Sequence, residues 1–426
     1  MKVTFCTRNY GTLSGGHNTW LCRVLPYLRH RGVESRVLCF TSSSDEACPT
    51  VHSLRETGFS CTVLSEEEKK YTEEQLRWVI ERLLEDPPDV FVLNAVIPAA
   101  YYAARWVRDA GIPTVGICHI GASHILYPGL VDEFVFGSAD YQVSTLVCVS
   151  KYLERNVLER RPEKISVRNI PCGVAIPEAV AENANGRLRL AYVGRLAEVG
   201  KRISEVTHAL CRVVREIPGT EALIFGDGPA RPVVEQILRQ EGAGLPVHLV
   251  GFVENDQIQK RLLECHVLVL LSDWEGLPVS VMEGMACGLV SIGLRGAPGV
   301  TELIVDDVTG LLVGDRGDEF VAAVRRLRED PALWRRLAAS ARAEAKAEHS
   351  LEACAARWQN LFEEAVNKGG PRKPLRVPWR PNLPPVHPAL ADLDNRVPPP
   401  REQFLRFGRR VVTRLRFQYP SIFGSQ

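Results

Sequence analysis

The chain has 426 residues, of which 45% are hydrophobic and 24% are charged, and its formal net charge at pH 7 is +1. This length suits roughly two to three domains that can each bury a core without covalent cross-links. The ordinary composition and the balanced charge exclude global disorder and argue against nucleic acid as a partner.

The amino-terminal residues 1–7 are typical of a first strand and lack the charged-then-apolar pattern of a secretion signal. The apolar segment 90–104 is too short to span a membrane, and it contains Asn94 and Pro98. We predict a buried strand that runs into a helix here. We also expect a cytoplasmic protein.

Short apolar runs alternate with helical stretches through the first half of the chain. Strands that are apolar on both faces and alternate with helices are typical of parallel sheets covered on both sides. We therefore predict a Rossmann-like, doubly wound domain over residues 1–178. Its expected strands are 3–6, 36–40, 90–93, 114–118 and 146–149, and its clearest helices are 20–30, 73–85 and 99–109.

The second half repeats this alternation, which predicts a second Rossmann-like domain over residues 188–350. Residues 179–187 are small and polar and contain a glycine, so they suit a linker between the two domains. The expected strands of the second domain are 188–193, 222–225, 247–250, 267–271 and 290–293.

A last helix is predicted over residues 351–368, with Ser350 as its N-cap and apolar residues at helical spacing. Beyond it, residues 369–426 hold eleven of the 28 prolines, and eleven lysine and arginine residues against three acidic ones, a net charge of +8. We expect a Pro-rich basic tail in which residues 371–400 form an extended, semi-rigid spacer.

The spacer leads to a short basic segment, residues 401–417, which is amphipathic if it is helical. Its apolar side would consist of Phe404, Phe407, Val411 and Leu415. Such a segment suits an anionic membrane surface, which would make the protein peripheral on the cytoplasmic membrane face. It also suits docking on the acidic body of this protein or on a second subunit, the interpretation that is slightly favoured. Both interpretations stay open.

Ligands of open parallel sheets bind at the carboxyl ends of the strands, where helix amino termini present free N–H groups. After the first strand, Gly15 and Gly16 precede a helix, which lets the backbone approach an anionic or sugar ligand. The Gly-x-Gly-x-x-Gly pattern is absent, which argues against NAD. A flexible turn is the alternative interpretation.

After the first strand of the second domain, Arg195 and Lys201 lie on a strand-to-helix loop, where a diphosphate needs charged partners. The alternative interpretation is that both side chains are simply exposed to water at the surface and bind no ligand. Further on, Pro278 suits the first turn of a helix, whose free N–H groups near residues 277–281 would point toward the same sheet edge.

Glu283 lies deeper in this otherwise apolar helix. An ionised carboxylate there costs several kcal/mol unless it is paired. A ligand hydroxyl or a buried arginine or lysine could be the partner.

His119 ends an apolar strand of the first domain and so falls on the same edge; His17 and His124 are weaker candidates. Asp392 and Asp394 resemble a metal-holding carboxylate pair, but they lie in the Pro-rich tail. The twelve cysteines are scattered singly, without zinc spacing. We therefore predict no metal site and expect buried free thiols.

Together these residues resemble the retaining glycosyltransferases of the GT-B fold, family 4, from Met1 to about Asn367. The core of the resemblance is the Glu-x7-Glu pattern from Glu275 to Glu283. Supporting matches are the Gly15-Gly16 loop, Val149-Ser150-Lys151-Tyr152-Leu153, Ile170-Pro171-Cys172-Gly173-Val174, Gly194-Arg195-Leu196 with Lys201, and Gly226-Asp227-Gly228-Pro229.

The resemblance implies two Rossmann-like domains that face each other across a cleft, with the final helix crossing back to the first domain. It implies that Arg195 and Lys201 bind the donor diphosphate, Glu283 the ribose, and Glu275 the transferred sugar beside His119. The implied catalytic residues are His119, Arg195, Lys201 and Glu275. The implied donor-binding residues are Gly15, Gly16, Gly194, Arg195, Lys201, Gly226, Glu275, Gly276, Leu277, Val279 and Glu283.

The activity implied is retaining, metal-independent transfer from a nucleoside diphosphate sugar to a hydroxyl on a carbohydrate or lipid-linked acceptor, extending to surface polysaccharide or glycolipid assembly. No cofactor is implied. Uridine is favoured as the base, and guanosine stays open. A nucleotide-sugar epimerase or hydrolase and a non-catalytic scaffold are the rivals. The family's Gly-Phe-Gly after the first glutamate is Gly276-Leu277-Pro278 here, which removes one amide donor.

Overall fold

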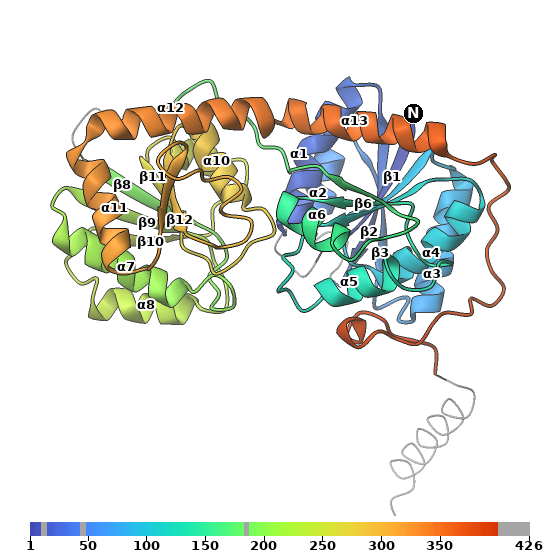
Figure 1. The fold of residues 1–426 in the computed structure, drawn as a ribbon. Helices are drawn as coiled ribbons and strands as arrows, with labels where there is room; N and C mark the ends of the chain where they lie inside the picture. Colours follow the sequence, from blue (N-terminus) through green and yellow to red (C-terminus); the bar gives the residue numbers. More distant parts are fainter. Residues whose placement is uncertain (10–14, 43–47, 183–186, 399–426) are drawn as a thin grey trace, which may run out of the picture.

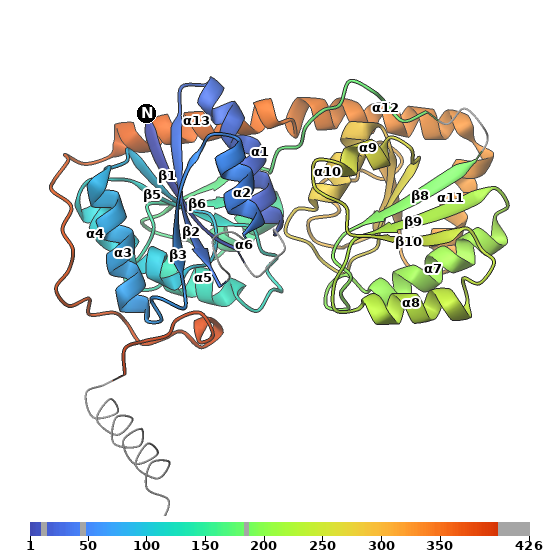
Figure 2. The ribbon, with the colours of Figure 1, turned by 180° about the vertical axis from the view of Figure 1, so that it is seen from behind.

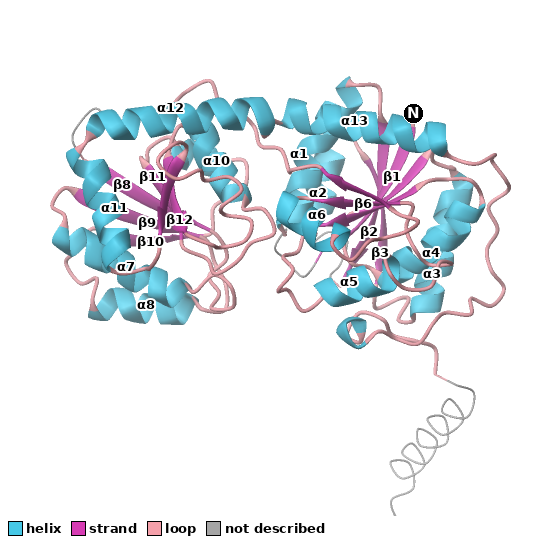
Figure 3. Ribbon diagram, in the orientation of Figure 1, coloured by secondary structure: helices cyan, strands magenta, loops and turns pink. Residues whose placement is uncertain are grey.

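The computed structural model describes residues 1–9, 15–42, 48–182 and 187–398, which form two α/β domains side by side (Figure 1). Strands lie inside each domain and helices cover them (Figure 3). This arrangement confirms the two predicted Rossmann-like domains.

The first domain is built on a seven-stranded sheet in the order β3-β2-β1-β4-β5-β6-β7, in which all neighbours are parallel. The central strands are almost wholly buried, as expected for a sheet covered on both faces. The elements are β1 (Lys2–Asn9), α1 (Gly16–His30), β2 (Glu34–Thr41), α2 (Pro49–Glu56), β3 (Ser60–Ser65), α3 (Thr72–Glu85), β4 (Val90–Leu93), α4 (Pro98–Asp109), β5 (Thr114–Cys118), α5 (Tyr127–Phe134), β6 (Thr145–Cys148), α6 (Lys151–Leu158) and β7 (Ser166–Asn169).

The second domain has a six-stranded parallel sheet in the order β10-β9-β8-β11-β12-β13. In both sheets the strand order reverses beside the first strand, at β1/β4 and at β8/β11, which is where open α/β sheets bind ligands. Its elements are β8 (Leu188–Val193), α7 (Ile203–Glu216), β9 (Thr220–Phe225), α8 (Arg231–Gln240), β10 (Val247–Gly251), α9 (Ile258–Leu262), β11 (Val267–Leu270), α10 (Val279–Cys287), β12 (Val290–Leu294), β13 (Gly310–Val313), α11 (Asp318–Glu329) and α12 (Pro331–Glu348). Helix α13 (Leu351–Lys368) follows in the chain.

Helices α12 and α13 run along one side of both domains (Figure 2). The Ser350 hydroxyl accepts a hydrogen bond from the Ala353 N–H at 3.2 Å, which confirms the predicted cap of α13. Helix α13 packs on α1, where Trp358 lies against Trp20 with ring centroids 5.5 Å apart. The last helix therefore joins the core of the first domain although it follows the second in the chain.

The prediction of a spacer after α13 is corrected by the structure. Residues 369–398 have little regular structure, but they lie along the first domain instead of extending away from it. Leu390 is fully buried against Gly129 of α5. Asp394 is buried too and pairs with Arg396, so it has a structural partner. The basic segment 401–417 lies outside the described residues.

All twelve cysteines are free thiols, and ten of them are buried, as predicted. Within the described part of the chain, no helix combines the length and the apolar character needed to cross a bilayer.

Candidate functional site

A cavity of about 320 Å³ lies where the two domains meet, at the carboxyl ends of both sheets. The first domain contributes the start of α1 and the loop after β5, and the second contributes the loops after β8 and β11. Eight predicted residues line it: Gly16, His119, Arg195, Lys201, Glu275, Gly276, Leu277 and Val279. The weaker candidates His17 and His124 also line it.

The two cations from the loop after β8 differ in their partners. The Lys201 Nζ atom lies 2.6 Å from Glu275 Oε1 in a partly buried ion pair. Arg195 is exposed, and no carboxylate of the described residues pairs with it. This wall of the cavity thus carries two cations and one carboxylate, which Lys201 already neutralises, so it is suited to an anion.

The amino end of α10 also faces the cavity, since Leu277 and Val279 line it. Pro278 is the N-cap of this helix, one position before the first turn in which it was expected. A helix amino terminus carries a partial positive charge and N–H groups without helical partners. It adds to the positive potential from the two cations.

His119 directly follows β5 and is half-buried, and its side chain is held by Asn94. The His119 Nε2 atom lies 2.9 Å from Asn94 Oδ1, and the Asn94 amide in turn donates to Thr7 Oγ1 at 3.0 Å. Because an amide oxygen only accepts, Nε2 carries the proton. Burial, reinforced by the nearby His17, lowers the pKa of His119 to about 3. The imidazole is therefore neutral near pH 7.

Glu283 lies on α10 and is buried, but it does not line the cavity. Its Oε1 atom lies 2.6 Å from Nη1 of Arg23, which reaches across from α1 in the first domain. Burial raises the pKa of Glu283, and the charge of Arg23 opposes that rise. Of the two partners left open by the sequence, the structure shows the arginine.

The glycines play two different roles. A Cβ atom on Gly16 would meet nothing within 4 Å, so its backbone borders open space in the cavity. A Cβ atom on Gly276 would lie 2.3 Å from the carbonyl oxygen of His119, so the two domains can approach this closely only at glycine.

Gly15 is the N-cap of α1, and neither it nor Gly194 or Gly226 lines the cavity. Gly226 has φ +137°, and a Cβ atom there would fall 1.9 Å from the Gly194 carbonyl oxygen. The pair therefore allows the loops after β8 and β9 to pack together.

Three residues of this region were not foreseen from sequence. Trp274 lines the cavity, and its indole lies 6.4 Å from the His124 ring. Asn94 orients His119, and Arg23 holds Glu283. The sequence itself marks two of them. Asn94 is a polar residue directly after the buried strand β4, and Trp274 directly precedes Glu275.

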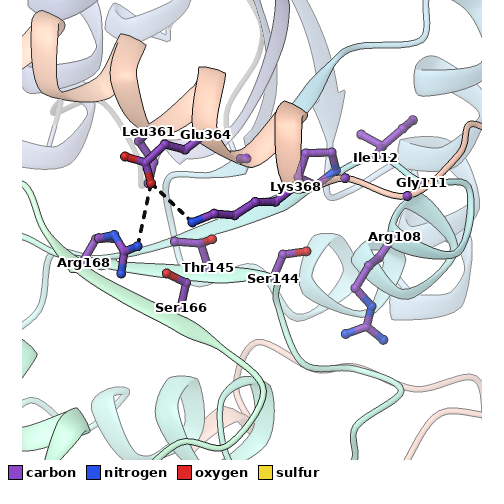
Figure 4. A pocket seen from close by; sticks show the side chains of 14 residues that line it. Arg108, Gly111, Ile112, Ser144, Thr145, Ser166, Arg168, Leu361, Glu364 and Lys368 are labelled. Atoms are coloured by element: carbon purple, nitrogen blue, oxygen red, sulfur yellow. Dashed lines mark ion pairs between the residues drawn. The ribbon is translucent and has the colours of Figure 1, made fainter.

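A second cavity, of about 280 Å³, lies at the opposite edge of the first sheet, under the end of α13 (Figure 4). Its Glu364 carboxylate lies 3.8 Å from Arg168 and 3.6 Å from Lys368. Arg108 donates to the backbone carbonyls of residues 139, 140 and 142. Because these charged groups and donors already have partners beside them, we assign the function to the cavity between the domains. Nowhere in the described ranges do three or more His, Cys, Asp or Glu side chains form a group that could hold a metal ion.

Two family models match the chain, one on each domain. The model for glycosyltransferase family 4 matches residues 14–176, and the model for glycosyl transferases group 1 matches residues 178–344. Together they include every predicted site residue.

Curated relatives match part of the chain. An alpha-D-kanosaminyltransferase from Streptomyces kanamyceticus is 31% identical over 174 residues, which is 41% of this chain and 45% of that protein. The lipopolysaccharide core biosynthesis glycosyltransferase LpsD from Rhizobium meliloti (strain 1021) is 29% identical over 232 residues, 53% of this chain and 65% of that protein. The matched segments thus span less than two thirds of these relatives.

Solved structures match over both domains. The structure of Alr3699/HepE from Anabaena in complex with UDP and glucose has a TM-score of 0.68 at 18% identity and covers 85% of this chain and 100% of that one. A mutant of S. aureus TarM in complex with Fondaparinux, alpha-GlcNAc-glycerol and UDP has a TM-score of 0.69 at 12% identity and covers 85% and 99%. At these identities the likeness establishes the fold.

Proposed function

Because the chain belongs to the family 4-like glycosyltransferases of the GT-B fold, we propose that it transfers a sugar from a nucleoside diphosphate sugar to a hydroxyl acceptor. The observation that carries this proposal is the cavity between the two domains, which is lined by the exposed Arg195 and by the Lys201–Glu275 ion pair. A diphosphate would supply the negative charge that this cationic wall lacks, and a sugar would supply hydroxyls that donate hydrogen bonds to the Glu275 carboxylate.

In this proposal the donor rearranges the ion pair at the cavity wall. The donor diphosphate binds Arg195, Lys201 and the amino end of α10. Lys201 then leaves Glu275 for a phosphate oxygen, and the released Glu275 carboxylate accepts hydrogen bonds from the sugar hydroxyls. Charge-assisted bonds of this kind are shorter and stronger than neutral ones.

The ribose is assigned to Glu283, whose carboxylate is held by Arg23 in the structure. Arg23 either shares this carboxylate with the ribose or yields it when the nucleotide binds. Gly16 approaches the diphosphate from the first domain, where its backbone borders open space.

We assign retaining transfer that needs no metal ion. The bond between the sugar C1 and the β-phosphate oxygen breaks, a bond from the acceptor oxygen to C1 forms on the same face, and the acceptor proton moves to the leaving phosphate. The two cations and the helix terminus stabilise the negative charge that develops on this phosphate. His119, whose pKa is about 3, is uncharged near pH 7, and its Nε2–H is donated to Asn94, so it can offer the sugar only Nδ1, as a hydrogen-bond acceptor.

Uridine is proposed as the donor base, because HepE, TarM and the pneumococcal O-GlcNAc transferase GtfA were solved with UDP. A carbohydrate or lipid-linked acceptor is proposed, because LpsD belongs to lipopolysaccharide core biosynthesis. Surface polysaccharide or glycolipid assembly would be the setting, with the basic segment 401–417 bringing the protein to an anionic membrane.

A thermal-shift panel of nucleoside diphosphates and their sugars, run in EDTA, tests the proposal. A ligand at about 100 times its dissociation constant stabilises a protein by roughly 2.7 kcal/mol. We expect uridine ligands to raise the Tm, and the best donor to yield a glycosylated acceptor by mass spectrometry. Failure of every nucleotide to bind would identify a scaffold protein, and donor consumption without an acceptor product would identify an epimerase or hydrolase.

A further inference from the structure

One contact between the two domains lies outside the cavity. Glu302 belongs to the second domain, in the turn that follows β12. Its Oε2 accepts the N–H of Lys151 at 2.7 Å, and its Oε1 accepts the N–H of Tyr152 at 2.6 Å. Lys151 and Tyr152 are the first two residues of α6 in the first domain. A carboxylate of one domain therefore binds the amino terminus of a helix in the other.

The helix terminus is well suited to this carboxylate. The third N–H group of α6, from Leu153, already donates to the Ser150 hydroxyl at 3.3 Å. Glu302 takes the first two N–H groups, so three of the groups without helical partners are satisfied. Its negative charge also lies at the positive end of the helix dipole. Both effects favour the closed arrangement of the domains.

The turn that carries Glu302 is bound to the loop that carries Glu275. The Glu275 N–H donates to the Pro298 carbonyl at 2.9 Å. A Cβ atom on Gly299, where φ is +78°, would lie 2.6 Å from the Glu275 carbonyl oxygen. This close backbone packing ties the position of one loop to that of the other. On the other side, Ser150 directly follows Val149, which lines the cavity.

A second contact between the domains, the Arg23–Glu283 ion pair, is different in kind. Arg23 of α1 in the first domain binds Glu283, a residue that we assign to the donor ribose. On the same helix α1, the Thr19 hydroxyl accepts a hydrogen bond from the Asn255 side-chain amide at 2.9 Å. Donor binding can therefore alter the contact at Glu283. Glu302 does not line the cavity, so its bonds are compatible with a bound donor.

We infer that Glu302 is a positioning residue: it latches the second domain to the amino terminus of α6 and thereby fixes Glu275 against the opposite wall of the cavity. The contact between Glu302 and α6 is made by the two domains alone and needs no ligand. Its effect on turnover rests on the proposed function.

The test compares wild type with Glu302→Ala and Glu302→Gln, in the full chain without ligand. The side-chain amide introduced by Glu302→Gln would turn its NH₂ group toward a backbone N–H, so this variant loses one bond and the charge while keeping the shape. Glu329→Gln is the matched control, because Glu329 is an exposed glutamate at the end of α11 in the same domain. Glu302→Asp, which keeps the charge with a shorter reach, replaces the alanine variant if that variant does not fold.

Hydrogen exchange of peptides containing residues 151–152 and small-angle X-ray scattering report the latch without any substrate. We expect faster exchange at these two amides and a larger radius of gyration in both latch variants, with the control equal to wild type. Unchanged exchange and radius in the latch variants would overturn the inference.

A kinetic comparison then separates positioning from simple loss of stability. We expect kcat/KM for transfer to fall about tenfold or more, while the Kd for UDP stays within about threefold of wild type. The reason is that Arg195, Lys201 and Glu283, which we assign to UDP, all belong to the second domain. An unchanged kcat/KM in a variant that opens would overturn the link to Glu275. Opening of the variants, combined with no transfer by wild type, would leave the latch standing and remove the proposed function.

Discussion

At the cleft, charged and polar side chains are held in defined states by partners that lie far away in the chain. Lys201 neutralises Glu275 across 74 residues, and Arg23 neutralises Glu283 across 260. Arg195 is the cation without such a carboxylate among the described residues. These states decide what the cavity can bind, because a buried charge is tolerated only beside an opposite charge or a ligand.

Replacement of Glu283 tests the ribose assignment. Glu283→Ala should weaken the binding of UDP by about tenfold or more, because a hydrogen bond to a charged group contributes about 1.5 to 3 kcal/mol. Titration calorimetry measures the Kd for UDP of wild type, Glu283→Ala and Arg23→Met. Glu329→Ala, an exposed site in the same domain, is the control. A UDP affinity in Glu283→Ala equal to that of wild type would refute the role of Glu283.

The neutral state of His119 predicts a pH dependence of stability. Its pKa is about 3 in the folded protein and ordinarily 6.5, so below pH 6.5 the unfolded chain binds a proton that the folded chain does not. The free energy of unfolding should therefore fall as the pH drops, by up to about 1.4 kcal/mol per pH unit from this group.

Urea denaturation between pH 7.5 and 5 compares wild type with His119→Gln, and with His30→Gln as an exposed control. The stability difference between wild type and His119→Gln should shrink as the pH is lowered. Parallel stability curves for these two proteins would contradict the buried neutral state.

Among the elements, the central strands were easier to predict than the edge strands. Strands β4, β5 and β11 are wholly apolar or nearly so because helices cover both faces of the sheet, and this leaves a clear pattern in the sequence. The edge strands β3 and β7 are partly exposed, and their residues include Ser, Thr, Arg and Asn. They were missed because a strand that pairs on one side needs no continuous apolar run.

The loops after the strands bring the domains together, and Gly276 is the tightest point of their contact. Gly276→Ala would place a Cβ atom 2.3 Å from the His119 carbonyl oxygen, which belongs to the backbone and cannot turn away. We expect the cleft to open and kcat/KM to fall by about 100-fold, since small misplacements at a reacting centre cost that much.

Separation of the domains relieves the clash, so the Tm of Gly276→Ala should change little. Gly370→Ala is the matched control, because a Cβ atom there meets nothing within 4 Å. Steady-state kinetics and scanning calorimetry together test this prediction. Turnover of Gly276→Ala at the level of the control would show that the cleft does not need this approach.

On the scale of the whole molecule, the chain crosses between the domains and then returns. Helix α13 and residues 369–398 belong to the first domain although they follow the second in sequence. The basic tail could be predicted from composition alone, whereas its first thirty residues pack on the domain through scattered contacts such as Leu390. Likewise, eight of the residues that line the cavity could be predicted from strand ends and from the family resemblance. Their partners could not, because pairing depends on how the two domains meet.

Because residues 369–398 pack on the first domain, a test of membrane binding must truncate the chain after them. A truncation after residue 398 removes the basic segment but keeps the buried Leu390, whereas truncation at 368 would strip a packed part of the first domain. We expect the full chain, and not the 1–398 protein, to co-sediment with anionic vesicles at low salt, since each basic residue near an anionic surface contributes about 1 kcal/mol. High salt and neutral vesicles should abolish binding. A full chain that stays in the supernatant throughout would assign residues 401–417 to self-assembly or packing.

The central claim is that Arg195 and Lys201 bind the leaving diphosphate of a nucleotide sugar in the cavity between the domains. The most direct measurement is kcat/KM for transfer to an acceptor, with the donor that gives the largest thermal shift, for wild type, Arg195→Ala and Lys201→Ala in EDTA. The account predicts transfer by wild type and a loss of about 100-fold or more in each variant, with the fold intact, because each change removes a charge that stabilises the leaving group. Near-wild-type turnover in both variants would contradict it.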